Sequence, residues 1–161
     1  NQYIQCAQVL KYPQYTECLA KHIADYFQDD KIDLVIGPAM GGMIIAYEVA
    51  RQLDRPSIFT ERKDGVMELR RSFSVEPGQK VLVVEDVITT GGSVQEVIDI
   101  VKQSGGEIAG VGVLVDRSGG KVTFGVKQVA VLNLNVQAWK PEECPLCAEG
   151  LLPVVKPGSR N

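Results

Sequence analysis

The chain has 161 residues, a length typical of one domain, and folding at this size buries about 68–70% of the surface of the unfolded chain. Apolar residues make up 45% and charged residues 23%, which excludes disordered, collagen-like and coiled-coil proteins. Seventeen Lys and Arg against 20 Asp and Glu give a net charge of −3, so no global positive field attracts nucleic acid or an anionic membrane. An anionic ligand would need a local binding arrangement.

The sequence carries no signal for membrane insertion or secretion. No apolar run approaches the roughly 18 residues of a membrane span, and residues 1–6 lack the basic and apolar regions of a signal peptide. Of the four cysteines only Cys144 and Cys147 are close together, which is unlike a disulfide framework. A structural zinc at this pair would need two further ligands, so ordinary thiols are favoured. We expect a cytoplasmic protein that binds neither membrane nor nucleic acid.

Helical and strand patterns alternate along the first half of the chain. Helices are predicted from apolar residues at helical spacing, and strands from short apolar runs bounded by Gly and Pro. In chain order the predicted elements are a helix at about 15–29, a strand at 33–37, a helix at 43–53, a strand at 57–60, and a hairpin or flexible arm at 66–75.

The second half continues the alternation. The predicted elements are a strand at 80–84, a helix capped by Ser93 that stops at Gly105-Gly106, strands at 108–115 and 129–134, and a Pro-rich irregular remainder from Lys140. Apolar strands that alternate with helices are typical of a parallel sheet with helices on both faces. We predict one Rossmann-like α/β domain over residues 1–161, with ligands bound at the carboxyl ends of its strands.

The most informative segment for function is residues 81–93. Glu85 and Asp86 leave the predicted strand, and a Thr-Thr-Gly-Gly-Ser loop at 89–93 opens the next helix. Backbone N–H groups, hydroxyls and the helix N-terminus suit a phosphate. The two carboxylates would repel that phosphate unless the ligand also carries hydroxyls or a divalent cation. This combination predicts a sugar phosphate ligand, although each half alone is common in ordinary turns and helix caps.

The segment resembles the signature of the type I phosphoribosyltransferases, and the similarity extends over the whole chain. Within that family the chain is most similar to the orotate-using members, in their short bacterial and archaeal form. The supporting segments are 3–6, 37–42, 61–63, 116–118, 144–147 and 156–160. The resemblance implies magnesium-dependent transfer of a phosphoribosyl group from phosphoribosyl pyrophosphate to orotate, giving orotidine 5′-monophosphate and pyrophosphate in pyrimidine biosynthesis.

Site residues follow from the resemblance. Glu85 and Asp86 would bind the ribose hydroxyls and help to position Mg²⁺, with Lys63 as a further catalytic residue. Thr89 and Arg117 would approach the orotate ring and its carboxylate. The residues assigned to phosphoribosyl pyrophosphate are Ala39, Met40, Gly41, Arg62, Lys63, Glu85, Asp86, Val87, Ile88, Thr89, Thr90, Gly91, Gly92 and Ser93. No direct metal ligand set is implied, because the metal is held through the substrate.

The basic arm beginning at Arg62-Lys63 would close over pyrophosphate, with a homodimer exchanging arms between neighbouring active sites. The chain lacks the lysine that many members have in the 37–42 loop, and the lysine and histidine that often follow the Arg-Lys pair. Arg70 and Arg71 are candidates to replace them. A solvated hairpin would show a similar charge pattern. The resemblance also implies that an N-terminal segment, which covers the base in relatives, precedes residue 1.

Two other functions fit parts of the pattern. A purine phosphoribosyltransferase would share the phosphoribosyl pyrophosphate loop, but Arg117 favours an anionic base. A regulator with the same fold could sense phosphoribosyl pyrophosphate and bind nucleic acid, but the net charge of −3 disfavours it.

Overall fold

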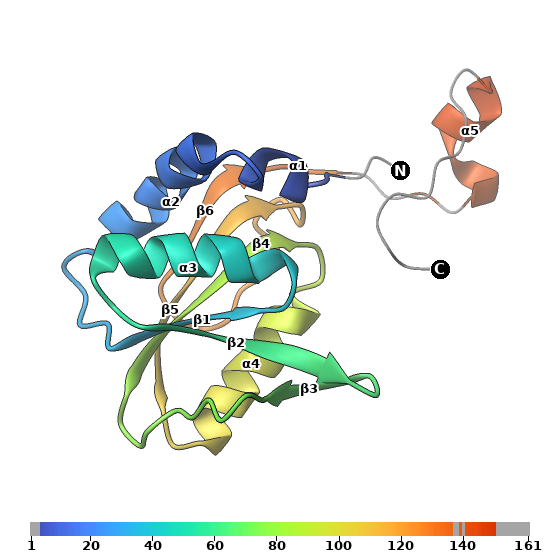
Figure 1. Cartoon of the computed structure of the whole chain (residues 1–161). Coiled ribbons are helices and arrows are strands. Elements are labelled where there is room, and N and C mark those ends of the chain that lie inside the picture. The colour runs from blue at the N-terminus through green and yellow to red at the C-terminus, as the bar shows by residue number, and fades with distance from the viewer. Residues whose placement is uncertain (1–3, 137–138, 140, 151–161) are drawn as a thin grey trace.

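A six-stranded sheet in the order β3-β2-β1-β4-β5-β6 organises the computed structural model, which describes residues 4–136, 139 and 141–150 (Figure 1). The elements are α1 (Ala7–Leu10), α2 (Pro13–Phe27), β1 (Leu34–Pro38), α3 (Gly41–Leu53), β2 (Ser57–Lys63), β3 (Val66–Leu69), β4 (Lys80–Ile88), α4 (Gly92–Gln103), β5 (Glu107–Asp116), β6 (Gln128–Asn133), the 3-10 helix η1 (Pro141–Glu143) and α5 (Pro145–Glu149). No helix in these residues is long and apolar enough to cross a membrane.

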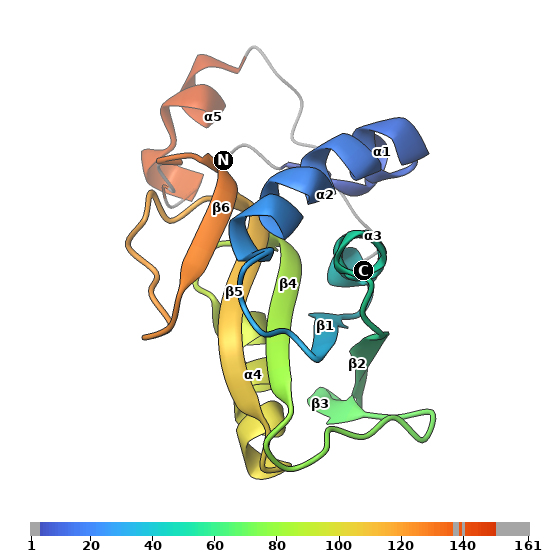
Figure 2. The ribbon, with the colours of Figure 1, turned by 90° about the vertical axis from the view of Figure 1, so that its left-hand side faces the viewer.

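Helices cover both faces of the sheet, as predicted. Helices α1, α2 and α3 lie on one face and α4 lies on the other (Figure 2). Each face has its own apolar core: Phe27, Ile45 and Leu82 are buried on the first, and Val83 and Ile98 on the second. The central strands β1 and β4 carry apolar residues on both faces, and each face is buried in one of the two cores.

The sheet is parallel except for β3. Strands β2 and β3 form an antiparallel hairpin over 57–69 rather than over the predicted 66–75, and only its second strand falls within the predicted range. Its turn is Asp64-Gly65, and both residues have positive φ, 52° and 85°. Asp-Gly is a common sequence in two-residue hairpin turns, in which both residues have positive φ. The Asp64-Gly65 pair would therefore have predicted the position of this turn.

Strand β4 extends to Ile88, four residues beyond its predicted end, so Glu85 and Asp86 lie within the strand. On one side β4 pairs with β5 as far as Ile88 opposite Asp116. On the other side its pairing with β1 ends at Val83. The second half of β4 is thus held by one neighbour only, and the side toward β1 is open for the loop that follows β1.

Helix α4 begins at Gly92, with Gly91 rather than Ser93 as its N-cap. Gly91 has φ 77°, a left-handed conformation that glycine adopts at little cost, and no side chain caps the helix. Uncapped N–H groups at a helix start need another acceptor. The predicted cap at Ser93 was wrong by two residues, and the difference leaves the first turn available to an anion.

Candidate active site

The acidic pair of β4 lies at the centre of the candidate site. Glu85 is 7% exposed, while Asp86 is half-buried. The Asp86 N–H donates to Glu85 Oε1 at 3.0 Å, and the Val87 N–H donates to Asp86 Oδ1 at 2.9 Å. Burial, followed by the hydrogen bond and charge of Asp86, raises the pKa of Glu85 well above its usual range. The fold therefore keeps an acceptor-rich pair close together despite the cost of burying charge.

The first two residues of α3, at the end of the segment predicted to bind pyrophosphate, lie directly against this pair. A Cβ added to Gly41 would lie 2.5 Å from Asp86 Oδ1, and one added to Gly42 would lie 2.9 Å from Glu85 Oε1. Only glycine fits such an approach of backbone to carboxylate. The Ala39 N–H donates to the Thr60 carbonyl at 2.7 Å, which fixes the loop to β2, and the Ala39–Met40 peptide bond is cis.

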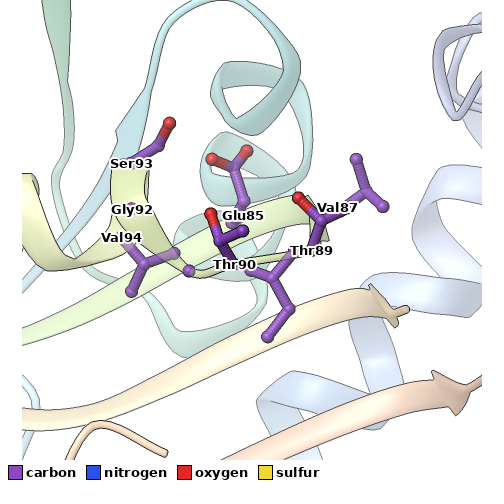
Figure 3. Close-up of a pocket in the computed structure, with 9 residues that line it drawn as sticks. Glu85, Val87, Thr89, Thr90, Gly92, Ser93 and Val94 are labelled. Carbon is purple, nitrogen blue, oxygen red and sulfur yellow. The ribbon is translucent and has the colours of Figure 1, made fainter. Parts of the chain in front are cut away.

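The β4–α4 connection forms a small polar hollow at the end of β4. Residues Glu85 and 87–94 line a cavity of about 70 Å³. Figure 3 shows the oxygens of Glu85, Thr90 and Ser93 directed to the same side of the connection. Thr89 and Thr90 are exposed and Ser93 is half-buried. The hollow, the hydroxyls and the start of α4 together form a phosphate-sized cradle next to a carboxylate.

Arg117 follows β5 at the same edge of the sheet. Its backbone N–H donates to the Ile88 carbonyl at 2.9 Å, so it begins next to the residue that precedes Thr89. Arg117 is half-buried. The structure thus brings the predicted base residues, Thr89 and Arg117, to adjacent strand ends, beside the cradle.

The four cations of the β2–β3 region divide into two kinds. Arg62 pairs with Glu96 of α4 and donates to the Gly65 carbonyl at 2.9 Å. Arg71 forms two 2.9 Å hydrogen bonds with Glu61, which lower the pKa of that carboxyl. Lys63 and Arg70 are exposed and form no ion pair with the part of the chain that is described. The hairpin therefore commits Arg62 and Arg71 to its own chain and leaves Lys63 and Arg70 to face solvent.

Several residues that support the site had no predicted role. Glu61 and Glu96 bind the arm arginines, and Cys6 packs behind the acidic pair with its sulfur 3.8 Å from the Asp86 carbonyl. Burial, then the charges of Asp86 and Glu85, raise the pKa of Cys6 to about 11, so its thiol stays protonated. Cys6 and Asp86 are 80 positions apart in the sequence, and Arg62 and Glu96 are 34 apart. Local sequence patterns do not connect residues at such separations. The matched segment at 156–160 and residue Tyr3 lie outside the described residues.

Comparisons with known proteins agree with this geometry. The sequence profile of the phosphoribosyl transferase domain matches residues 6–142. An orotate phosphoribosyltransferase of Desulforamulus reducens is 61% identical over 161 residues, 100% of this chain and 84% of that protein. One from Caldicellulosiruptor saccharolyticus is 58% identical over 159 residues, 99% of this chain and 83% of that protein.

Solved structures show the same fold. The orotate phosphoribosyltransferase of Aeropyrum pernix has a TM-score of 0.69 and 26% identity, covering 82% of this chain and 78% of that one. The adenine phosphoribosyltransferase of Rhodothermus marinus has a TM-score of 0.72 at 24% identity, covering 83% of this chain and 88% of that one, which shows the fold alone.

The mixed sheet with helices on both faces is the fold of a type I phosphoribosyltransferase, and the chain belongs to the phosphoribosyltransferase family. Its identity to curated relatives along its whole length places it, within that family, among the orotate phosphoribosyltransferases.

Proposed function

We propose that the protein transfers the phosphoribosyl group of phosphoribosyl pyrophosphate to orotate, releasing pyrophosphate. The observation that carries this proposal is the close approach of Gly41, at the start of α3, to the Asp86 carboxylate, because the start of α3 and the 89–93 loop then both adjoin one acidic pair. A ligand with a phosphate at one end, a pyrophosphate at the other and hydroxyls between them matches that order of groups.

Each loop has a defined part in holding the substrate. The N–H groups and hydroxyls of 89–93 bind the 5-phosphate, and the backbone of 39–41 faces the pyrophosphate. Glu85 and Asp86 accept from the ribose hydroxyls, and Val87 and Ile88 complete the strand beneath them. Negative charge here also stabilises the positive charge that grows on the ribose as its bond to pyrophosphate breaks.

The reaction needs no nucleophile from the enzyme, because orotate supplies the attacking nitrogen. Arg117 holds the orotate carboxylate and Thr89 approaches its ring, both at the strand ends next to the ribose. Lys63 supplies a positive charge to the departing pyrophosphate, since its exposed ammonium is not engaged by another described residue. Arg62 reaches the pyrophosphate only by exchanging its partner Glu96 for the substrate.

The donor set fits Mg²⁺ as the cofactor. Mg²⁺ prefers oxygen ligands and is commonly held by one or two carboxylates together with substrate phosphates, and Glu85 and Asp86 provide such oxygens. When bound, the ion neutralises charge on the leaving pyrophosphate.

The test of the proposed function is pyrophosphate release with four bases: orotate, adenine, xanthine and uracil. We expect release with orotate only and loss of release when the divalent cation is chelated. Release with adenine or xanthine instead would assign a purine enzyme, and release with none of them, together with a shift of labelled DNA in a mobility assay, would favour the regulator.

We further propose that the protein is a homodimer whose arms act in the partner's site. Met40, which precedes α3, and Ile44 and Tyr47 within the helix are 82%, 49% and 67% exposed, at positions i, i+4 and i+7 along one stripe. An apolar stripe of this kind on a monomer favours association with a second copy. The adjoining β2–β3 hairpin would then extend toward that copy.

Mixing two impaired variants tests arm exchange. Lys63→Ala is expected to keep about a tenth of the turnover and Asp86→Asn about a hundredth or less. If Lys63 acts across the dimer, randomly mixed chains recover about a quarter of the wild-type turnover, because half of the dimers are hybrids with one intact site. A turnover of only about a twentieth, the residual activity of the Lys63→Ala chains, would place Lys63 in its own chain's site. Tyr47→Glu should yield a monomer by sedimentation, and an unaltered dimer would move the interface elsewhere.

A further inference from the structure

The segment between β5 and β6 has no helix or strand of its own, yet side chains hold it in place. The buried Asp116 carboxylate, 2% exposed, accepts the Ser118 N–H at 2.7 Å and the Gly120 N–H at 3.1 Å. The Asp116 carbonyl also accepts the Leu134 N–H at 2.7 Å. Asp116 therefore fixes the chain on both sides of Arg117, and the two N–H groups offset the cost of burying its charge.

Two further side chains continue this scaffold. Ser118 Oγ accepts the N–H groups of Lys121 and Val122 at 3.0 and 3.1 Å. The Gln128 amide accepts from the Phe124 N–H at 3.2 Å and donates to the Val122 carbonyl at 3.1 Å. The side chains of Ser118 and Gln128 thus satisfy backbone groups of this segment that would otherwise bind water.

The scaffold holds residues 117–124, which follow β5, against the 89–93 loop, the proposed phosphate loop. A Cβ added to Gly91 would lie 2.7 Å from Val122 Cγ1 and 2.9 Å from Phe124 Cζ. The N-cap of α4 is therefore in contact with the segment that begins at Arg117. A displacement of Val122 or Phe124 would be felt at the phosphate cradle, because packed side chains transmit displacement.

We propose that Ser118 and Asp116 are positioning residues that hold the Arg117 segment in register with the phosphate loop and so set the affinity for the base. This rests on the proposed function, since Arg117 is its orotate ligand. Neither residue needs to touch the substrate. Ser118 acts by holding the turn that carries Val122, and Asp116 acts by holding the turn that carries Arg117.

Ser118→Ala is the decisive variant, with Ser104→Ala as its matched control. Ser104 Oγ donates one hydrogen bond to the Ile100 carbonyl at 3.0 Å, so both variants lose a half-buried serine hydroxyl, but Ser104 lies at the far end of α4. We expect Ser118→Ala to raise the orotate KM about fivefold with kcat within about twofold of wild type. Ser104→Ala should leave both constants unaltered, and Ser118→Thr, which keeps the hydroxyl, should restore the orotate KM.

The outcomes separate this inference from the function on which it rests. An unaltered orotate KM in Ser118→Ala, or an equal rise in Ser104→Ala, would overturn the positioning role while orotate turnover by the wild type stands. A wild-type protein that releases no pyrophosphate with orotate would overturn the proposed function itself. Asp116→Asn, compared by the same KM and kcat split, should act in the same direction as Ser118→Ala and more strongly, and an unaltered KM there would exclude Asp116.

An independent observation concerns Cys144 and Cys147. The N–H groups of Cys147 and Ala148 both donate to the Cys144 carbonyl, at 3.1 and 3.0 Å. This closed turn keeps the two Cα atoms within about 7 Å, a separation that a disulfide spans. Cys144 is buried and Cys147 is exposed. The Cys147 N–H lowers the pKa of Cys144, while the hydrogen bond with Cys144 raises the pKa of Cys147.

We infer that this pair is a reversible dithiol. The exposed Cys147 loses its thiol proton to solvent and attacks, as thiolate, a low-molecular-weight disulfide such as oxidised glutathione, forming a mixed disulfide and releasing one glutathione thiolate, which takes up a proton. Cys144, as thiolate, then attacks the Cys147 sulfur and expels the second glutathione, which takes up a proton. Two protein thiols are oxidised and one small disulfide is reduced to two thiols, so the exchange balances.

Intact mass after equilibration with oxidised glutathione tests the dithiol. We expect wild type to lose two hydrogens without an adduct at this pair, and Cys144→Ser to retain a glutathione adduct on Cys147. The exposed Cys18 is the internal control, because a lone thiol can form only the adduct. A stable adduct on Cys147 in the wild type, or stoichiometric zinc in the purified protein, would overturn the inference.

Discussion

The β4–α4 segment and the β2–β3 hairpin both carry predicted ligands of phosphoribosyl pyrophosphate, but they are built in opposite ways. Residues of the first are fixed by strand pairing, a buried carboxylate and the contact of Gly91 with Val122. The hairpin lies at the edge of the sheet, and its two paired arginines, Arg62 and Arg71, are themselves exposed. Exposed pairs contribute little to stability. The difference indicates that the β4–α4 segment is preorganised, whereas the β2–β3 hairpin can rearrange around the substrate.

The largest expected effect falls on the rigid region. Asp86→Asn keeps the shape of the side chain but removes its charge, so turnover should fall about 100-fold or more. Thermal unfolding should remain close to wild type, because Asp86 is only half-buried. Steady-state kinetics and calorimetry check this together, and unchanged turnover would remove Asp86 from the active site.

In the hairpin, Lys63→Ala should lower kcat about tenfold and leave the free energy of unfolding within about 0.5 kcal/mol of wild type. The exposed side chain makes no described ion pair whose loss could destabilise the fold. Lys31→Ala is a matched control, since Lys31 is exposed before β1 and at the opposite end of that strand from the site. An equal loss of kcat in both variants would contradict a specific role for Lys63.

Substitution of Gly91 measures how firmly the phosphate loop is packed. Gly91→Ala strains a φ of 77° and also meets Val122 and Phe124, so it should destabilise the protein by about 1–3 kcal/mol and raise the KM for phosphoribosyl pyrophosphate. Gly78→Ala carries the same backbone strain, at φ 76°, with nothing within 4 Å. The additional loss of unfolding free energy in Gly91→Ala, compared with Gly78→Ala, measures the contact of Gly91 with Val122 and Phe124. Equal losses in the two variants would show that this contact is unimportant.

The smallest effect concerns pH and the base of the hairpin. Arg71 lowers the pKa of Glu61, so this pair stabilises the folded state above the unfolded pKa of a glutamate, about 4.3, and the contribution disappears as pH falls through the lowered folded-state value. Glu61→Gln should therefore lower the Tm slightly at pH 7, and the difference from wild type should vanish in acid. A difference that persists at pH 2 would have another cause.

The sequence predicted the fold and the phosphate-binding region more completely than the hairpin. Local patterns located β1, β4, α3 and the 89–93 loop because burial on both faces and glycine placement leave strong periodic signals. Strand β4 proved longer because its end depends on pairing with β5, which local sequence does not record. The partners of Arg62 and Arg71 were not predicted, since Glu96 and Glu61 meet them only through tertiary packing.

Strand β3 also has a consequence for assembly. It is a four-residue strand at the edge of the sheet, and the exposed charges of Lys63, Asp64 and Arg70 flank it. Short, charged edge strands discourage other chains from adding to a sheet. The hairpin, whose lysine we propose as a ligand of pyrophosphate, thus also protects this edge of the sheet from pairing with other chains, and neutralising its charges should lower solubility as well as turnover.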